Sequence, residues 1–386
     1  MRLRLGLSFA LLGIFACGEA NDRSHKHVSR NMFTKAELRK KSKRNQRAVA
    51  RSSARCGECH GAYERTWKAS SHAKAATSPY FRASANGDGR CAPCHTPLVG
   101  EIADDDPIHE EGVTCDACHS IIEVNDDAPS PGLIFDLTAS IKYGPLCDSE
   151  GSYFHRSGCS PLHSKSRLCA GCHSLEWPSP NGEMLPVITD FDEWSAKGGR
   201  GATCQDCHMS GTPGEVARGF ATREKISRHD LFGADEELLR ASINLRASLR
   251  TGEEGSRDLE VTLTNRGALH SIPAGLAGRR FVLSINFIDI EGRSVGQAAR
   301  VYARILVDAQ GREVFFTEAR ALREDNRLHP GERRMERFRI PPSTTIAKVR
   351  LERFALAPEV AARLGLAVPQ GSLVHRTDVI IESDNP

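Results

Sequence analysis

Hydrophobic and polar residues alternate along much of the C-terminal part of the chain. Residues 259–264 read Leu-Glu-Val-Thr-Leu-Thr, and apolar residues recur with the same period of two across 281–287. This period is typical of β-strands that bury one face and expose the other. Similar runs occur at 305–307, 314–316, 335–340, 346–354 and 373–381. Short strands separated by turn signals predict an antiparallel β-sandwich domain over residues 241–386.

The segment 56–240 shows no such alternation, and its most regular feature is a short motif. Cys-x-x-Cys-His occurs five times in it, at unequal spacings, so a repeat protein of fixed period is excluded. The segment has little apolar side chain of its own. We therefore expect short helices and loops packed around bound groups. Residues 235–249 are expected to begin as a helix, and 357–365 to form a short helix.

The motif has a specific chemistry. Two cysteines three positions apart lie on one face of a helical turn, where each can form a thioether with a vinyl group of haem. The adjacent histidine then lies under the iron as its proximal ligand. The cysteines are Cys56, Cys59, Cys91, Cys94, Cys115, Cys118, Cys169, Cys172, Cys204 and Cys207, and the histidines are His60, His95, His119, His173 and His208. The motifs predict five covalent haems c in a mostly α-helical and irregular domain over 56–240.

Two other chemistries also use Cys-x-x-Cys pairs. Structural zinc usually takes two such pairs facing each other. Zinc does not require the histidine that follows every pair here, and an odd number of pairs leaves one unmatched. A thioredoxin-like dithiol needs only one motif. Haem attachment is the interpretation that accounts for all five copies.

Three of the 13 cysteines lie outside the motifs. Cys147 and Cys159 stand in the spacer between the third and fourth motifs. In an oxidising compartment they are expected to form a disulfide, and two free thiols are the alternative. Cys17 follows an apolar run at 5–15 that is too short to span a bilayer.

The N-terminus has the pattern of an export signal over residues 1–16. The run Ile14-Phe15-Ala16-Cys17 resembles a lipoprotein cleavage box, which makes Cys17 a candidate lipid anchor, and ordinary cleavage after Ala20 is the alternative. Residues 17–55 form a basic linker, with 12 Lys and Arg against two acidic residues over 21–55. We expect a protein exported to the periplasm or anchored to a membrane as a lipoprotein. The formal charge of only +3 argues against nucleic acid as a partner.

Histidines outside the motifs are candidates for the second axial ligand of each iron. Beyond His60 they are His72, His109, His155, His163, His229, His270, His329 and His375. Their number suffices for a second histidine on every iron, and such haems have low potentials compared with methionine-ligated ones. His329 precedes a turn and His375 lies in a strand pattern, so both are expected to be structural.

The chain resembles the multihaem cytochromes related to hydroxylamine oxidoreductase and to its tetrahaem cytochrome partner. The resemblance covers 56 to about 235 and rests on Trp67 to His72, on the motif contexts 112–119, 163–169 and 201–209, and on Arg228-His229-Asp230. A weaker likeness lies in His270-Ser271-Ile272-Pro273-Ala274-Gly275, where Ala274 departs from the usual Thr or Ser. The resemblance implies that the distal ligands are His72, His155, His163, His229 and His270, with His109 as the reserve for His155.

The sequence leaves two functions open. An electron carrier needs only closely spaced haems, each held by two histidines, whereas an enzyme acting on a small nitrogen or sulfur compound needs one iron with an open position. Spare histidines outnumber the haems, and no Cys-x-x-Cys-Lys motif occurs, which favours the carrier. Either would require a redox partner protein, and the β domain is a candidate for docking one, including a membrane or outer-membrane complex. Haem propionates would make the holoprotein acidic outside its basic arm, which favours a basic partner.

Overall fold

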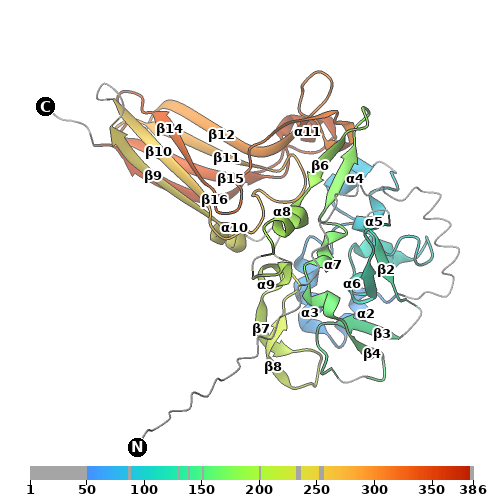
Figure 1. Ribbon diagram of the computed structural model, residues 1–386. Coiled ribbons are helices and arrows are strands. Elements are labelled where there is room, and N and C mark those ends of the chain that lie inside the picture. The colour runs from blue at the N-terminus through green and yellow to red at the C-terminus, as the bar shows by residue number, and fades with distance from the viewer. Residues whose placement is uncertain are drawn as a thin grey trace, which may run out of the picture.

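The computed structural model describes residues 50–85, 88–128, 131–137, 140–149, 152–199, 201–231, 236–251 and 256–382. The expected export signal, Cys17 and nearly all of the basic linker lie outside the described residues. No described helix is both long and apolar enough to cross a bilayer. Figure 1 shows two parts, one of short helices and hairpins and one dominated by long antiparallel strands.

The first part is built from short helices joined by loops. They are α2 (Ser53–Gly57), α3 (Gly61–Ala69), α4 (Pro79–Ala85), α5 (Ala92–His95), α6 (Cys115–His119), α7 (Arg167–Ala170), α8 (Asp190–Ala196) and α9 (Cys204–His208), with 3₁₀ turns η1 (Pro107–Glu111) and η2 (Pro161–Ser164). Its hydrophobic clusters are small, and one of them is centred on Leu98, Ile102 and Ile108. Short helices with little apolar core are what the motif-rich segment predicts.

Four two-stranded sheets interrupt these helices, and the sequence pattern did not predict them. They are β1 (Ile121–Val124) with β2 (Leu133–Phe135), β3 (Ile141–Gly144) with β4 (Arg156–Cys159), β5 (Leu175–Pro178) with β6 (Met184–Ile188), and β7 (Gly211–Glu215) with β8 (Thr222–Ser227). Strands of three to six residues are too short to show a clear period of two. Their pairing depends on contacts that local sequence does not reveal.

The second part begins with α10 (Glu236–Ser242) and contains two larger sheets. A three-stranded sheet has the order β14 (Arg333–Arg339), β10 (Arg257–Asn265), β9 (Ile243–Thr251). A five-stranded sheet has the order β13 (Ala321–Asp325), β12 (Ser294–Val307), β11 (Arg280–Ile288), β15 (Ile346–Phe354), β16 (Ser372–Ile380). The turn η4 (Phe316–Glu318) and helix α11 (Pro358–Arg363) complete this part.

Side chains from both large sheets enter one hydrophobic cluster. Leu259 and Val261 of β10 are fully buried in it, as are Phe281 and Leu283 of β11. Alternate residues of β10 point away from the cluster, which explains the period of two in the sequence. Burying one such side chain stabilises the fold by about 1.5–3 kcal/mol.

One local expectation was wrong and another was confirmed. The run 314–316 is not a strand, because Phe316 begins the turn η4 and its side chain is buried beside Trp177. The segment 235–249 begins as a helix, as expected: α10 ends at Ser242, and strand β9 begins at Ile243. Strand pairing of β9 with β10 along its whole length overrides any continued helix there.

The hairpin β5–β6 joins the two parts. Trp177, Leu185 and Val187 of this hairpin are buried in a cluster with Phe316 and other residues of the second part. The rings of Trp177 and Phe316 meet edge to face, with centres 4.9 Å apart. The backbone N–H of Ala277 donates to Val187 O at 2.9 Å. The two parts therefore share a core at this junction.

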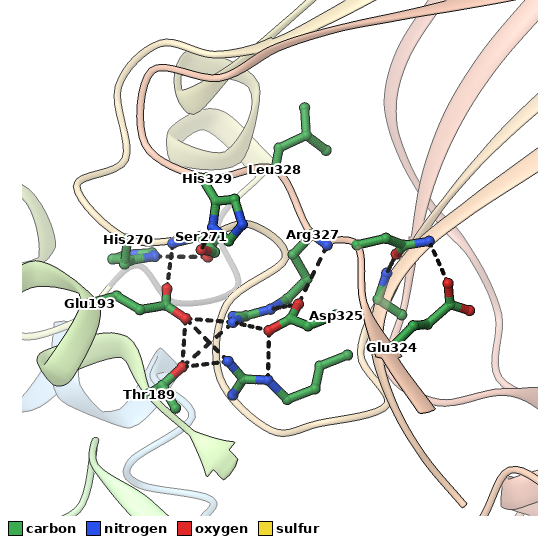
Figure 2. Close-up of polar contacts among 12 residues, drawn as sticks. Thr189, Glu193, His270, Ser271, Glu324, Asp325, Arg327, Leu328 and His329 are labelled. Carbon is green, nitrogen blue, oxygen red and sulfur yellow. Dashed lines mark hydrogen bonds and ion pairs between the residues drawn. The ribbon is translucent and has the colours of Figure 1, made fainter. Parts of the chain in front are cut away.

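A buried ionic network lies beside the same junction (Figure 2). Glu193 of α8 accepts hydrogen bonds from Arg304 at 3.2 Å and from Arg327 at its Oε1 atom. Asp325 binds both arginines, each at 2.8 Å. The arginine side chains are only 6% and 3% exposed. Guanidinium groups this deeply buried require paired carboxylates, so Glu193 ties α8 to the second part.

Candidate haem sites

Each motif places its two cysteines and its histidine on one helical turn. In the first motif the backbone N–H of His60 donates to Cys56 O at 2.9 Å, and in the fourth that of His173 donates to Cys169 O at 2.9 Å. All ten motif cysteines are free thiols. They are therefore available for thioether bonds.

Threonine caps begin two of these turns. Thr114 accepts a hydrogen bond from Ala117 N in front of α6, and Thr203 accepts one from Asp206 N in front of α9. In return the Asp206 carboxylate accepts a hydrogen bond from the Thr203 backbone N–H, which completes a capping box. These caps stabilise very short helices that could not form alone. They explain why threonine precedes both motifs.

Thiols of different motifs contact one another in three places. Side-chain hydrogen bonds join Cys56 to Cys115, Cys94 to Cys172, and Cys169 to Cys204. The fold thus brings the first motif beside the third, the second beside the fourth, and the fourth beside the fifth. These contacts join the sites into two groups, the first with the third and the fourth with the second and the fifth, although their spacing in the sequence is irregular.

Backbone carbonyls orient three proximal histidines. The Nδ1 atoms of His60, His95 and His119 donate to Val216 O at 2.5 Å, Ala75 O at 3.0 Å and Tyr143 O at 2.6 Å. Protonation at Nδ1 leaves Nε2 unprotonated, which is the form that binds a metal. In His173 the corresponding contact is with Asp190 Oδ2 at 3.6 Å. Sequence analysis did not identify Asp190 as a partner of His173.

Four proximal histidines face a second histidine ring at a characteristic separation. A bond between a metal and an imidazole nitrogen is about 2 Å long, so two imidazoles on opposite sides of one iron have ring centres roughly 6 Å apart. The centres of His60 and His155 are 6.0 Å apart, those of His173 and His72 6.2 Å, and those of His208 and His270 6.3 Å. These separations fit an iron between each pair.

The third motif has two candidates for its second ligand. His163 lies 5.8 Å from His119, and His229 lies 6.1 Å from it, centre to centre. Nδ1 of His229 donates to Ser227 O, which leaves its Nε2 free, whereas Nε2 of His163 donates to Cys118 O. The buried Nδ1 of His163 has no partner in the described structure. Only one of the two rings can face the iron of His119.

The second motif differs from the other four. Among the described residues, no histidine ring faces His95 at the separation that an iron requires. Its imidazole stacks instead on Phe81 of α4, with centres 4.2 Å apart and planes 11° from parallel. The sequence analysis did not identify Phe81. Its only signal was its place close to the second motif.

Burial keeps several of these rings neutral. Desolvation lowers the pKa of His72, His163, His208 and His229 to about 4 in each case. Neutral imidazole is the form that binds iron. The rings are therefore ready for coordination at neutral pH without losing a proton.

The zinc interpretation receives no support from this geometry. In the part of the chain that the structure describes, no three His, Cys, Asp or Glu side chains gather around a common point. A structural zinc site requires four such ligands in a tetrahedron. The side chains instead meet as pairs of imidazoles, which suits a metal whose other ligands come from a macrocycle.

A close backbone contact holds His72 in place. Val113 N donates to His72 O at 3.0 Å, and Trp67 Nε1 donates to Val113 O at 2.8 Å. Gly112 has φ +74°, and a Cβ there would lie 2.5 Å from His72 O. Only glycine permits this approach. The element Trp67 to His72 is thus packed against the segment before the third motif.

The remaining histidines have other partners. His109, the reserve ligand, donates from Nε2 to Ala103 O at 2.9 Å and makes no ring contact with a proximal histidine in the described residues. His329 Nδ1 bonds Ser271 Oγ at 2.9 Å, and His375 Nε2 donates to Ile243 O at 2.8 Å. His329 and His375 have the structural contacts expected of them.

Cys147 and Cys159 form a disulfide, as expected. It links the loop after β3 to the end of β4. Asp148 next to it pairs with Arg223 of β8 at 2.9 Å. The spacer between the third and fourth motifs is thereby fastened to the strands that follow the fifth.

Comparisons with known proteins concern the class of protein. A family model described as cytochrome c554 and c-prime matches residues 55–120, which contain the first three motifs. The fold is similar to that of a penta-heme cytochrome c552 from Thermochromatium tepidum, with a TM-score of 0.70 and 22% identity, over 86% of this chain and 99% of that chain. A putative ApaA protein from Bordetella pertussis matches 36% of this chain and 93% of its own, at 15% identity and a TM-score of only 0.20. No curated protein sequence matches. The family match, the shared fold and the five motifs support a multihaem c-type cytochrome.

Proposed function

We propose that this protein transfers electrons through five covalently bound haems, most of them held by two histidines. The observation that carries the proposal is the separation of about 6 Å between paired imidazoles in four of the five motifs. Each Cys-x-x-Cys-His motif would hold one haem through two thioethers and one axial nitrogen. Bound haem supplies one-electron chemistry at its iron.

The contacts between motifs support conduction rather than isolated sites. Thiols of the first and third motifs touch, as do those of the second and fourth and of the fourth and fifth. Haems attached to touching thiols would lie close together. The chain's role is to hold the axial rings neutral and oriented, through carbonyls such as Ala75 O and Tyr143 O. Fixed ligands reduce the rearrangement that accompanies electron transfer.

Intact mass and spin state together test this proposal. The mature protein should gain the mass of five haems, and at least four irons should be low-spin in the oxidised protein. A mass with four or fewer haems after complete maturation contradicts the haem number. High-spin signals from most irons would contradict coordination by paired histidines.

A second function deserves testing because of His95. No described histidine ring faces His95 at the separation that an iron requires, so the iron bound to His95 would lack a second histidine from the described residues. An open position allows a small nitrogen or sulfur compound to bind and react there. This is the enzyme alternative, and it places the reaction at the second motif.

Carbon monoxide binding distinguishes the two functions. If the iron of His95 is open, one haem in five should be high-spin and should bind carbon monoxide in the reduced protein. A fully low-spin wild-type protein that binds no carbon monoxide would leave electron transfer as its function.

The same proposal includes four finer points. It relates the chain to hydroxylamine oxidoreductase and its tetrahaem partner. It divides the chain into a signal at 1–16, a basic linker at 17–55, a pentahaem domain at 56–240 and a β-sandwich domain at 241–386. It places the protein in the periplasm or on a membrane through Cys17, and it requires a redox partner protein. The shared cluster of the two large sheets supports the β-sandwich.

A further inference from the structure

The outward face of the three-stranded sheet β9-β10-β14 is rich in arginine. Arg246 and Arg250 lie on β9, and Arg333, Arg337 and Arg339 lie on β14, all at positions that pair with outward residues of β10. All five are exposed. Arg266 follows directly after β10 and is also exposed. The face is thus strongly cationic, opposite in sign to the charge that propionates would give the haem region.

At one end of this face, carboxylates of β10 neutralise the arginines. Glu260 of β10 has a side chain that is only 6% exposed, and it pairs with Arg250 at 3.5 Å and with Arg337 at 3.6 Å. Asp258 pairs with Arg339 at 3.6 Å. The arginines at this end therefore have carboxylate partners within the sheet.

The other half has no such partners. Arg246, Arg266 and Arg333 surround a hollow of about 360 Å³ together with Asn244, Thr262 and Thr264. No carboxylate lines this hollow, and within the described residues none of the three arginines forms an ion pair. Guanidinium, hydroxyl and amide groups that line one hollow favour a carboxylate or a similar anion. We call Arg246, Arg266 and Arg333 the arginine cluster.

The end of β10 next to the arginine cluster is bonded to the turn that carries one candidate haem ligand. Asn265, between Thr264 and Arg266, donates from Nδ2 to His270 O at 3.0 Å, and its own carbonyl accepts from Gly331 N at 2.9 Å. His270 faces His208 of the fifth motif. Figure 1 shows the start of β9 beside α10, toward α8 and α9. The unpaired arginines are therefore at the end of the sheet nearest the fifth haem site, and the neutralised ones are at the far end.

We propose that the arginine cluster is the docking site of an acidic electron-transfer protein, which exchanges electrons with the haem held by His208 and His270. This inference rests on the proposed electron transfer and names its partner surface. One electron passes between the iron and the partner, so that one is oxidised and the other reduced, and no bond is made or broken. An acidic side chain of the partner would enter the hollow. Binding to a lipid surface would not require a haem site at this end of the sheet, whereas electron exchange with a partner protein does.

Two small redox reagents, one anionic and one cationic, test the docking site in the full holoprotein. Ferricyanide carries negative charge, as the acidic partner would, and hexaammineruthenium(III) is the cationic reference. The reduced protein is mixed with each at low ionic strength, so that its haem irons are oxidised while the reagent is reduced. The double variant R266Q/R333Q should lower the ferricyanide rate constant about three- to tenfold and should not lower the ruthenium rate constant. The difference should vanish at about 0.5 M salt.

A matched control removes equal charge elsewhere on the same face. The variant R337Q/R339Q should change the ferricyanide rate constant less than about twofold, because those arginines are already paired with carboxylates. Equal losses in both double variants, or no loss in R266Q/R333Q, would overturn the proposal. Vesicles of phosphatidylglycerol supply another test: if R266Q/R333Q releases the protein from them while its ferricyanide rate constant is unchanged, the cluster is a lipid site and the proposal is wrong. A wild-type protein that exchanges electrons with neither reagent would instead contradict the proposed function.

Discussion

The ring of His270, on the turn before β11, lies 6.3 Å from the ring of His208 in the fifth motif, with planes 23° apart. His270 belongs to the part of the chain dominated by long strands, and His208 to the part that carries the motifs. An iron between them would join the two parts through one coordination bond on each side. The turn is also anchored by Ser271 N, which donates to Glu193 Oε2 at 2.7 Å.

Replacing His270 by alanine should therefore open one iron. We expect a new high-spin signal and new binding of cyanide or carbon monoxide, because no other histidine faces His208 in the described residues. His375→Ala is the matched control, since that ring bonds Ile243 O and faces no motif. A His270→Ala protein that stays as low-spin as wild type would show that His270 is not an axial ligand.

Gly112→Ala should displace His72. The added Cβ would lie 2.5 Å from His72 O, so the Trp67 to His72 element must shift and the iron of His173 should become partly high-spin. Gly182→Ala is the control, because Gly182 has a similar positive φ with nothing within 4 Å of its added Cβ. The control should cost about 1 kcal/mol of stability and leave the spin state unchanged. Equal spectra for the two variants would refute the positioning role of Gly112.

Glu193→Gln should weaken the junction between the two parts. It leaves the buried arginines Arg304 and Arg327 with one carboxylate fewer, at a cost of about 3 kcal/mol in the free energy of unfolding. Urea unfolding followed by circular dichroism measures this loss. Glu291→Gln, which breaks an exposed pair with Arg293, should cost less than about 1 kcal/mol.

Acid should reduce the contribution of Glu193 to stability. Burial alone would raise the pKa of Glu193, but Arg327 and the other donors outweigh it and the pKa is lowered. A carboxyl group with a lowered folded-state pKa stabilises the fold above its unfolded pKa, about 4.3, and loses that effect as pH falls through the folded value. The difference between wild type and Glu193→Gln should therefore be largest above about pH 5 and shrink below pH 4. A pH-independent difference would contradict this account.

Removing the disulfide should destabilise the spacer after the third motif. Cys147→Ser/Cys159→Ser opens a loop of sequence separation 12, which costs about 3 kcal/mol by the chain-entropy model. Reductant should lower the stability of wild type by a similar amount and leave the variant unaffected. Alkylation of unreduced, denatured wild type should label neither cysteine, and labelling of both would disprove the bond.

Cys17→Ala should release the protein from membranes if the lipid anchor is real. The expected result is a shift into the soluble periplasmic fraction, measured by haem staining after cell fractionation. A distribution identical to wild type, or a mature N-terminus at Asn21, would exclude lipidation at Cys17. This position lies outside the described residues, so the prediction rests on the sequence.

The sequence by itself determined the features whose chemistry is local. A haem motif needs only five consecutive residues, because two thioethers and one ligand arise from a single helical turn. The alternation at 259–264 likewise reports which side of β10 is buried. The pairing of Cys147 with Cys159 followed from counting the cysteines that the motifs leave over.

Only the tertiary structure decided which distant residues meet. His72 and His173, or His208 and His270, are brought to about 6 Å by packing at the junction and at Gly112, and no local pattern reports such separations. The tertiary structure likewise determines the stacking of Phe81 on His95 and the absence of carboxylate partners around the arginine cluster in the described residues. Both depend on which residues the rest of the fold places next to a side chain, because the partner of a ring and the compensation of a charge are properties of the surroundings rather than of the residue.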